Sequence, residues 1–350
     1  MDSVTQFALG AAVGAAMLGP RIGVRKAVVL GGIYGTLPDL DSLLPTEDPV
    51  DSFISHRGAT HSLFIQAMAT PVFAEPLVRL FAGLRDQRIK TYLAVYLIFA
   101  THAIIDAMTI YGTRLLMPIY DGPVGVGSIF IIDPLYTLPL LIVTIWGLFV
   151  GGWTAGYGRW LKRALIVSSL YMALSVPLQT VMKSRALTTL NEMGVAATSE
   201  NTLTIPAPFS LFYWKSAVVE DDRYINLYQP LFDDDAHAYA HPRRGDLLEP
   251  LAAVPAFRDL AAFSKGSYSI STDEQNIIFS DLRMGLTPTY AFRFAVARQG
   301  LDGSLVPIVP VRPPSQRRQE GDLEWLLAGI AQSPILRPAE QGQLLFVSPN

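Results

Sequence analysis

The sequence predicts a membrane all-α fold, a polytopic helical bundle over residues 1–185, followed by a soluble α+β domain over residues 186–350. Half of the 350 residues are hydrophobic and only 16% are charged, a composition too apolar for an ordinary soluble protein. Charge is also unevenly distributed, since 19 of the 30 acidic residues lie in residues 186–350. Apolar stretches of helical length, in contrast, are confined to the first half.

Six such stretches are predicted to form helices. The last four are long enough to cross a bilayer, which requires roughly 20 residues. The first two are short and rich in glycine, which predicts close-packed, tilted or re-entrant helices. The first lacks a basic start and a clear cleavage pattern, so we expect it to be retained rather than removed as a signal peptide. The stretches are residues 4–19, 24–38, 60–82, 91–111, 129–151 and 161–182.

The loops between these stretches predict the orientation. Nine basic residues lie in the loops after stretches 1, 3 and 5, and two lie in the loops after stretches 2 and 4. Because basic loops remain in the cytoplasm, the other loops and residues 186–350 are predicted to be extracytoplasmic. The expected location is the bacterial inner membrane, in contact with membrane lipids. With a net charge of −3 and no basic stripe, no nucleic-acid partner is expected.

The second half mixes predicted strands with two helical patterns. Alternation of apolar and polar residues predicts strands, while residues 306–319, which contain four prolines, are predicted to be an extended connector rather than an element. The expected strands are residues 211–219, 224–228, 267–270, 276–279 and 290–296, and the expected helices are residues 247–263 and 323–330.

Ionisable residues within the apolar half are the candidates for chemistry, because they are costly in a membrane unless paired, hydrated or bound to metal. His102 and Asp106 lie four residues apart in the fourth stretch, so both project from one helix face. This spacing suits two ligands of one ion. A buried His-Asp pair that only holds helices together is the alternative.

Further candidates lie at the predicted outer ends of stretches 2 and 3. Asp39 and Asp41 follow Pro38, with a spacing that can point both carboxylates at one centre. Thr60 is the predicted N-cap of stretch 3. Stretch 4 runs outward, so its two ionisable residues can join the set. The predicted metal ligands are Asp39, Asp41, His56, His61, His102 and Asp106.

A His and carboxylate shell in a chain without cysteine suits zinc, or else manganese or iron. Six candidate ligands exceed the needs of one tetrahedral site, so one or two ions are predicted. Such a site can activate water and bind a phosphoryl oxygen. Arg57 can neutralise an anionic substrate, with interfacial snorkelling as its alternative role. Arg57 and Asp106 are the predicted catalytic residues.

Several neighbouring residues are predicted to line the site or support it. Tyr111 and Arg114 can line a substrate entrance, with membrane anchoring as the alternative for Tyr111. Asp133 can act in proton transfer, but a helix N-cap before Pro134 is favoured. In the second half, the acidic run 233–235 lacks the pattern of an EF-hand and is predicted to be a solvated loop.

Three motifs carry a family resemblance: residues 37–41 (LPDLD), 56–62 (HRGATHS) and 101–106 (THAIID) with 109–112 (TIYG). They resemble the bacterial membrane-bound metal-dependent hydrolase family of YdjM-type inner-membrane proteins, itself distantly similar to the zinc-dependent phospholipase C and P1 nuclease superfamily. The resemblance covers residues 1–185 and implies a helical metal site built from the six predicted ligands. Many members carry a histidine where this chain has Gln6. An amide is a poorer metal ligand, so either one metal position differs or Gln6 orients water or substrate.

The first functional hypothesis is therefore a metal-dependent hydrolase of a membrane-associated, phosphorylated substrate, either a lipid or a lipid-linked compound. The second is a protein without catalysis, whose polar cluster is a structural metal clamp or an ion or proton site of a transporter. An apolar cytoplasmic half of the helices argues against a transport pathway. An intramembrane protease is a weaker third choice, because the sequence lacks H-E-x-x-H.

Overall fold

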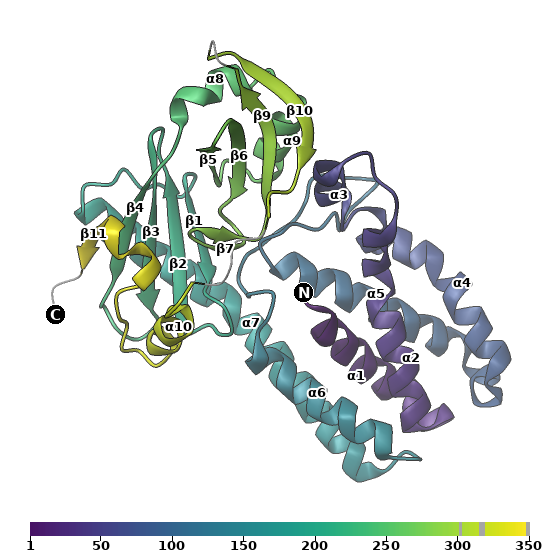
Figure 1. Ribbon diagram of the computed structural model, residues 1–350. Helices are drawn as coiled ribbons and strands as arrows, with labels where there is room; N and C mark the ends of the chain where they lie inside the picture. The colour runs from purple at the N-terminus through teal and green to yellow at the C-terminus, as the bar shows by residue number, and fades with distance from the viewer. Residues whose placement is uncertain (301–302, 315–318, 348–350) are drawn as a thin grey trace. The chain divides into compact units, whose positions relative to one another are not determined.

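The computed structural model describes residues 1–300, 303–314 and 319–347. It divides the chain into two compact units. Met1–Leu44 and His56–Val176 form the N-terminal unit, and Pro45–Ser55 and Pro177–Asn350 form the C-terminal unit. Figure 1 labels the elements of both units.

The N-terminal unit is helical, and each of the six predicted apolar stretches forms a helix. Four helical stretches, Ser3–Ile22, Leu63–Leu80, Ala82–Met108 and Ala155–Glu192, are long and apolar enough to cross a membrane. The α-helices are α1 (Ser3–Ile22), α2 (Val24–Thr36), α4 (Leu63–Leu80), α5 (Arg88–Met108), α6 (Pro134–Phe149) and the first part of α7 (Ala155–Glu192). Short 3₁₀ turns η1 (Leu37–Leu43), η2 (Ala59–His61) and η3 (Ala82–Gln87) lie between them.

Glycines allow α1 and α2 to pack closely, as their sequence predicts. A Cβ atom on Gly10 would lie 2.4 Å from the carbonyl oxygen of Gly31, and one on Gly35 would lie 2.6 Å from that of Gln6. Neither position can hold a larger residue without separating the helices. This packing places the N-terminal part of α1 beside the end of α2, from which η1 begins.

Polar side chains cap the N-termini of two helices near the site. Asp133 accepts hydrogen bonds from the backbone nitrogens of Leu135 and Tyr136, which confirms it as the N-cap of α6. The predicted cap of α4 is wrong by two residues, because Ser62 is the N-cap and accepts from the backbone nitrogen of Ile65. Thr60 instead lies in η2, where its hydroxyl is available to another partner.

The C-terminal unit contains two larger antiparallel sheets and a two-stranded ribbon. Five strands form the order β1-β2-β3-β4-β11 and four form the order β10-β9-β6-β5. The first sheet consists of β1 (Thr202–Pro206), β2 (Tyr213–Val219), β3 (Arg223–Pro230), β4 (His237–Pro242) and β11 (Leu344–Val347). The second consists of β5 (Tyr268–Asp273), β6 (Asn276–Asp281), β9 (Arg293–Gln299) and β10 (Leu305–Val311), and the ribbon of β7 (Gly285–Leu286) and β8 (Thr289–Tyr290).

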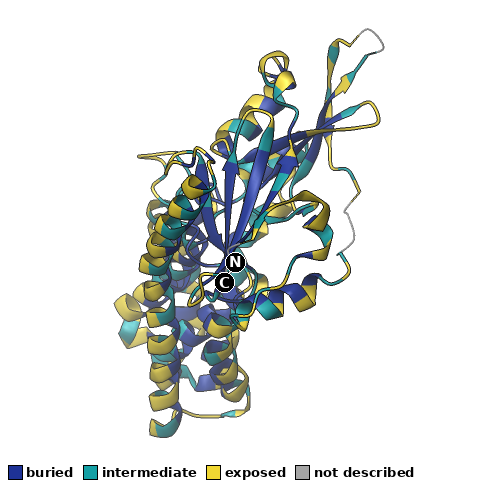
Figure 2. Ribbon diagram, turned by 90° about the vertical axis from the view of Figure 1, so that its left-hand side faces the viewer, coloured by how far each residue is buried: buried dark blue, intermediate teal, exposed yellow. Residues whose placement is uncertain are grey.

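Helices cover both faces of the five-stranded sheet. The second part of α7 packs Ala186 and Leu190 against Ile225 and Leu227 of β3. On the other face, Trp325 of α10 (Asp322–Ile330) joins an aromatic core formed by β2, β3 and β4. Figure 2 shows the resulting contrast between buried strands and the exposed outer faces of the long helices.

All five predicted strands and both predicted helical patterns are found, with the first pattern split by its prolines into α8 (Leu248–Leu251) and α9 (Pro255–Phe263). The predicted connector over residues 306–319 is wrong in its first part, which forms β10. Its prolines are tolerated because β10 is an edge strand, where a missing N–H need not break a ladder. Residues 315–318 of that prediction lie outside the described residues.

The acidic run 233–235 is a loop, as predicted, and it precedes β4. His241 of β4 pairs with the buried carboxylate of Glu340, with 2.6 Å between Nε2 and Oε1. Glu340 also accepts hydrogen bonds from Arg337, Tyr228 and Asn226. This network ties the chain after α10 to the five-stranded sheet.

We expect this network to make the C-terminal unit sensitive to acid. Burial acts to raise the pKa of Glu340, but the hydrogen bond to His241 and the charge of Arg337 outweigh it and lower the pKa from 4.5 to about 2. A lowered folded pKa stabilises the unit above pH 4.5, and this contribution, about 3 kcal/mol, is lost as the pH falls towards 2. Glu340→Gln should flatten that pH dependence, measured by hydrogen exchange of β3 and β4 in the full chain. Exposed Glu324→Gln is the control, and an unchanged acid dependence in Glu340→Gln would contradict this assignment.

One short helix of the C-terminal unit comes from far away in the sequence. Helix α3 (Pro49–Ser55) is capped by the preceding Asp48, whose carboxylate accepts hydrogen bonds from the backbone nitrogens of Val50 and Asp51. Phe53, which is 2% exposed, lies between the rings of Phe263, Phe292 and Phe294, with centroid distances of 5.0, 4.3 and 5.4 Å. The segment between the candidate site residues Asp41 and His56 is thus part of the core of the C-terminal unit.

Candidate metal centre

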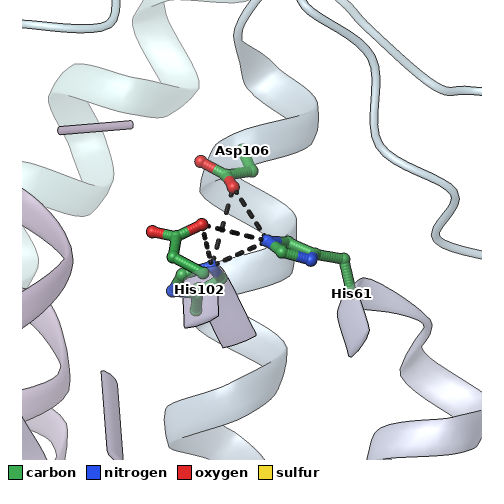
Figure 3. Close-up of side chains that lie close together, drawn as sticks. His61, His102 and Asp106 are labelled. Atoms are coloured by element: carbon green, nitrogen blue, oxygen red, sulfur yellow. Dashed lines mark hydrogen bonds and ion pairs between the residues drawn. The ribbon is translucent and has the colours of Figure 1, made fainter. Parts of the chain in front are cut away.

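Four of the six predicted ligands converge in the N-terminal unit. Asp39 comes from η1, His61 from η2, and His102 and Asp106 from successive turns of α5. One ligand atom of each lies within 4.8 Å of all the others. Figure 3 shows the imidazoles of His61 and His102 and the carboxylate of Asp106 pointing towards one another.

The distances among these four side chains fit a metal centre. Five of the six pairs of ligand atoms are close enough to form ion pairs or hydrogen bonds. Asp39 Oδ1 lies 3.3 Å from His61 Nε2 and 3.5 Å from His102 Nε2. Asp106 Oδ2 lies 3.4 Å and 3.6 Å from the same two atoms, which are 3.0 Å apart. Ligands at 2.0–2.2 Å from a tetrahedral ion are separated by about 3.3–3.6 Å, so the group matches the size of such a shell.

Burial and hydrogen bonding also favour a metal. Oδ2 of Asp106 is fully buried and accepts no hydrogen bond within the described part of the chain. His102 Nδ1 lies 2.6 Å from the carbonyl oxygen of Gly35. Because a carbonyl only accepts, Nδ1 must carry the proton, which leaves the Nε2 lone pair free to face the centre. This is the usual arrangement of a metal-binding histidine.

His61 is oriented from its other side. Its Nδ1 lies 2.9 Å from the hydroxyl of Thr60 and 3.5 Å from Oδ2 of Asp41. Its Nε2 lies 3.3 Å from Oδ1 of Asp39 and 3.4 Å from Oδ2 of Asp106, and these negative charges favour a protonated ring when no metal is bound. A ligating histidine must be neutral, so a metal ion at this site would take the place of the proton.

Asp41 and His56 lie beside this group rather than in it. Their side chains pair at 2.7 Å, from Asp41 Oδ1 to His56 Nδ1. The other oxygen of Asp41 accepts from the hydroxyl of Thr60 and from the backbone nitrogen of Arg57, at 2.8 and 3.1 Å. Burial acts to raise the pKa of Asp41, but its contacts with His56, His61 and Thr60 outweigh burial and hold the pKa well below its usual range. In this geometry Asp41 orients His61 and the loop that precedes it.

Arg57 is a buried cation next to the four ligands. Its Nε lies 3.1 Å from Oδ2 of Asp106, and one terminal nitrogen donates to the hydroxyl of Thr109 at 3.1 Å. The guanidinium stacks on Tyr111, 4.8 Å from the ring centroid. With 4% of its surface exposed, Arg57 does not snorkel to the membrane surface. The backbone φ of Arg57 is +63°. A positive φ is uncommon for a residue other than glycine, and such strained residues cluster at functional sites.

Gln6 supports Asp106 from the opposite side. Its Nε2 donates to Oδ1 of Asp106 at 3.0 Å. The amino group of Met1 contacts the same oxygen. Both interactions leave Oδ2 directed at the two histidines. In this geometry Gln6 orients Asp106, a role that differs from the predicted one of orienting water or substrate.

The remaining predicted residues lie further from the ligands. Arg114 pairs with exposed Asp121 at 3.2 Å, while its backbone nitrogen donates to the carbonyl of Arg57. Asp133 caps α6 and accepts from the hydroxyl of Tyr171 at 2.8 Å. Sequence reasoning missed the roles of Gly35 and Thr109, which act through a carbonyl and a hydroxyl and have no recognisable spacing.

Asp41→Asn tests the orienting role. We expect the affinity for a divalent metal to fall by about 10- to 100-fold, as is typical when a partner of a metal-binding histidine is changed, while all four ligands remain. Competition with a chelator measures the affinity, and Asp121→Asn is the exposed control. A loss no larger than that of the control would show that Asp41 does not position His61.

Two comparisons with known proteins found similarity to this chain. The chain is 28% identical over 159 residues to the uncharacterized protein YfhP of Bacillus subtilis (strain 168), an alignment that covers 43% of this chain and 47% of YfhP. The chain thus spans about half the length of this relative. No solved structure matches. The family described as YdjM inner membrane protein matches residues 1–186, which include all four converging ligands, and the chain belongs to this family.

Proposed function

We propose that the protein is a membrane-bound, metal-dependent hydrolase that acts on a membrane-associated, phosphorylated substrate, a lipid or a lipid-linked compound. The observation that carries this proposal is the group of two histidines and two carboxylates whose ligand atoms lie within 4.8 Å of one another. A divalent ion held there would acidify a bound water and polarise a phosphoryl oxygen. Zinc suits this donor set, and manganese or iron are alternatives.

The residues around the group support an anionic substrate. Two carboxylates balance the charge of a divalent ion, so Arg57 leaves the centre with a net positive charge. The guanidinium is fixed by Thr109 and by its stack on Tyr111, and it can donate to a developing negative charge without reorganisation. Asp39, with 24% of its side chain exposed, is the most accessible of the four ligands. Substrate would therefore approach from the side of η1.

The charge of the loops supports an outward-facing site. Basic residues cluster where α1 meets α2, where α4 meets α5 and where α6 meets α7. The ligands come from the opposite helix ends: the chain after α2, the chain before α4 and the last turns of α5. If the basic loops remain in the cytoplasm, the metal centre and the C-terminal unit are extracytoplasmic. This topology gives the site access to lipids and lipid-linked compounds of the outer leaflet.

A purified, metal-loaded preparation of the full chain tests the activity against extracted membrane lipids, with release of phosphate or a phosphorylated headgroup as the readout. Arg57→Gln should keep its metal but lose about 10²- to 10³-fold in kcat, the usual effect of removing one donor to transition-state charge. Arg258→Gln, an exposed arginine of the C-terminal unit, is the control. Absence of turnover in the metal-loaded wild type would overturn the hydrolase proposal.

One observation favours the second function, a structural metal clamp without catalysis. Four protein side chains complete a tetrahedron, whereas a catalytic zinc keeps one position open. A clamp predicts that metal removal lowers the stability of the N-terminal unit while no substrate is turned over. The hydrolase predicts turnover, with one carboxylate yielding its place or the shell expanding to admit water.

A further inference from the structure

A groove between α6 and α7 lies apart from the metal centre. The two helices are antiparallel, because Ser168 donates to the carbonyl of Tyr136 at 2.8 Å and Tyr157 donates to that of Val143 at 3.2 Å. The groove has a volume of about 390 Å³, within the size of small-ligand pockets, about 300–1,000 Å³. It is lined by Leu135, Leu138, Pro139, Ile142, Val143, Trp160, Arg163, Ala164 and Val167.

The groove suits a hydrocarbon chain. Of the residues that line it, Arg163 alone is charged, and the others are apolar. Its wall on α6 runs from Leu135 to Val143, a length of about 12 Å at the rise of an α-helix, close to the thickness of one leaflet, about half of a 30 Å hydrocarbon core. Leu138, Ile142 and Val167 remain exposed, so the walls have room for a partner. In an inner membrane protein that partner is available as a lipid acyl chain.

One end of the groove is basic. The guanidinium of Arg163 lies over the ring of Trp160, 4.8 Å from its centroid, and Arg159 and Lys162 lie on the same turn of α7. The sequence contains no acidic residue between Asp133 and Glu192, so the segment offers no local counter-charge. Tryptophan and arginine are typical of the level of lipid headgroups, and a guanidinium binds phosphate in a bidentate manner.

We propose that this groove binds an anionic phospholipid, with one acyl chain between α6 and α7 and the headgroup phosphate on Arg163. The occupant is a lipid rather than a second copy of the chain, because two copies share one orientation in a membrane and would bring their basic residues to the same face. The basic residues lie in the first part of α7, towards the α6–α7 loop, and no residue that lines the groove belongs to the metal centre, so this site is distinct from the proposed hydrolase site.

Native mass spectrometry of the full chain, after reconstitution in vesicles of phosphatidylglycerol and phosphatidylethanolamine, tests the proposal. The wild type should retain phosphatidylglycerol in preference, and Arg163→Gln should retain about tenfold less, since it loses a charge-assisted bidentate contact. Lys162→Gln removes the same charge from a residue that does not line the groove and should stay within about twofold of wild type.

A second pair of variants tests the groove itself. Val167→Trp should fill it and lower retention, while Leu170→Trp, an exposed residue of α7 outside the groove, should not. Equal losses in Arg163→Gln and Lys162→Gln, retention without headgroup preference, or a dimer whose contacts cover α6 and α7 would each overturn the proposal. None of these outcomes depends on turnover, so the test is independent of the proposed activity.

Discussion

Replacement of His102 by alanine is expected to abolish stoichiometric metal binding. His102 Nε2 lies 3.0–3.6 Å from the ligand atoms of the other three residues, so its loss removes one of four ligands and opens the shell. The affinity should fall by more than the about 10- to 100-fold loss caused by changing an outer hydrogen-bond partner. Elemental analysis of purified protein measures the bound metal.

His56→Ala is the matched control, since His56 pairs with Asp41 outside the four-ligand group. It should keep one metal per chain. Full metal content in His102→Ala would contradict the assignment of the centre.

Phe53→Ala is expected to destabilise the C-terminal unit by about 3–5 kcal/mol, the usual cost of removing a fully buried aromatic side chain. The cavity would open between Phe263, Phe292 and Phe294, which contact its ring. Hydrogen exchange of β6 and β9 in the full chain should accelerate by about two to four orders of magnitude. The effect is unusual because residue 53 precedes the rest of this unit by more than a hundred residues.

Phe232→Ala provides the control for aromatic truncation, because Phe232 belongs to the same unit but is 76% exposed. Its effect should stay within about 0.5 kcal/mol. Unchanged exchange of β6 and β9 in Phe53→Ala would show that α3 does not belong to the core of the C-terminal unit.

The sequence predicts the helices well because their length and apolar composition are local properties. It also points to the four residues that converge in the structure, since ionisable residues are rare in and beside apolar stretches. It does not separate Asp39 from Asp41, because the alternating spacing suggests that both face one centre. In the structure these residues lie in the 3₁₀ turn η1, which directs Asp39 to the histidines and Asp41 to His56.

Other features depend on contacts that local patterns do not contain. Strand β10 carries prolines and is held by pairing with β9, so its composition resembles a connector. Strands β1, β4 and β11 have short or polar sequences and were not predicted for the same reason. Phe53 is buried by aromatic rings more than 200 residues away in the sequence. The spacing of apolar residues around position 53 cannot indicate such a contact.

Asp39, His61, His102 and Asp106 are expected to bind one divalent ion. X-ray absorption spectroscopy of the purified wild-type chain, with elemental analysis of the same sample, tests it most directly. We predict one metal per chain surrounded by two imidazole nitrogens and carboxylate oxygens at about 2.0–2.2 Å. Protein without stoichiometric metal, or a metal whose shell lacks imidazole, would contradict the account.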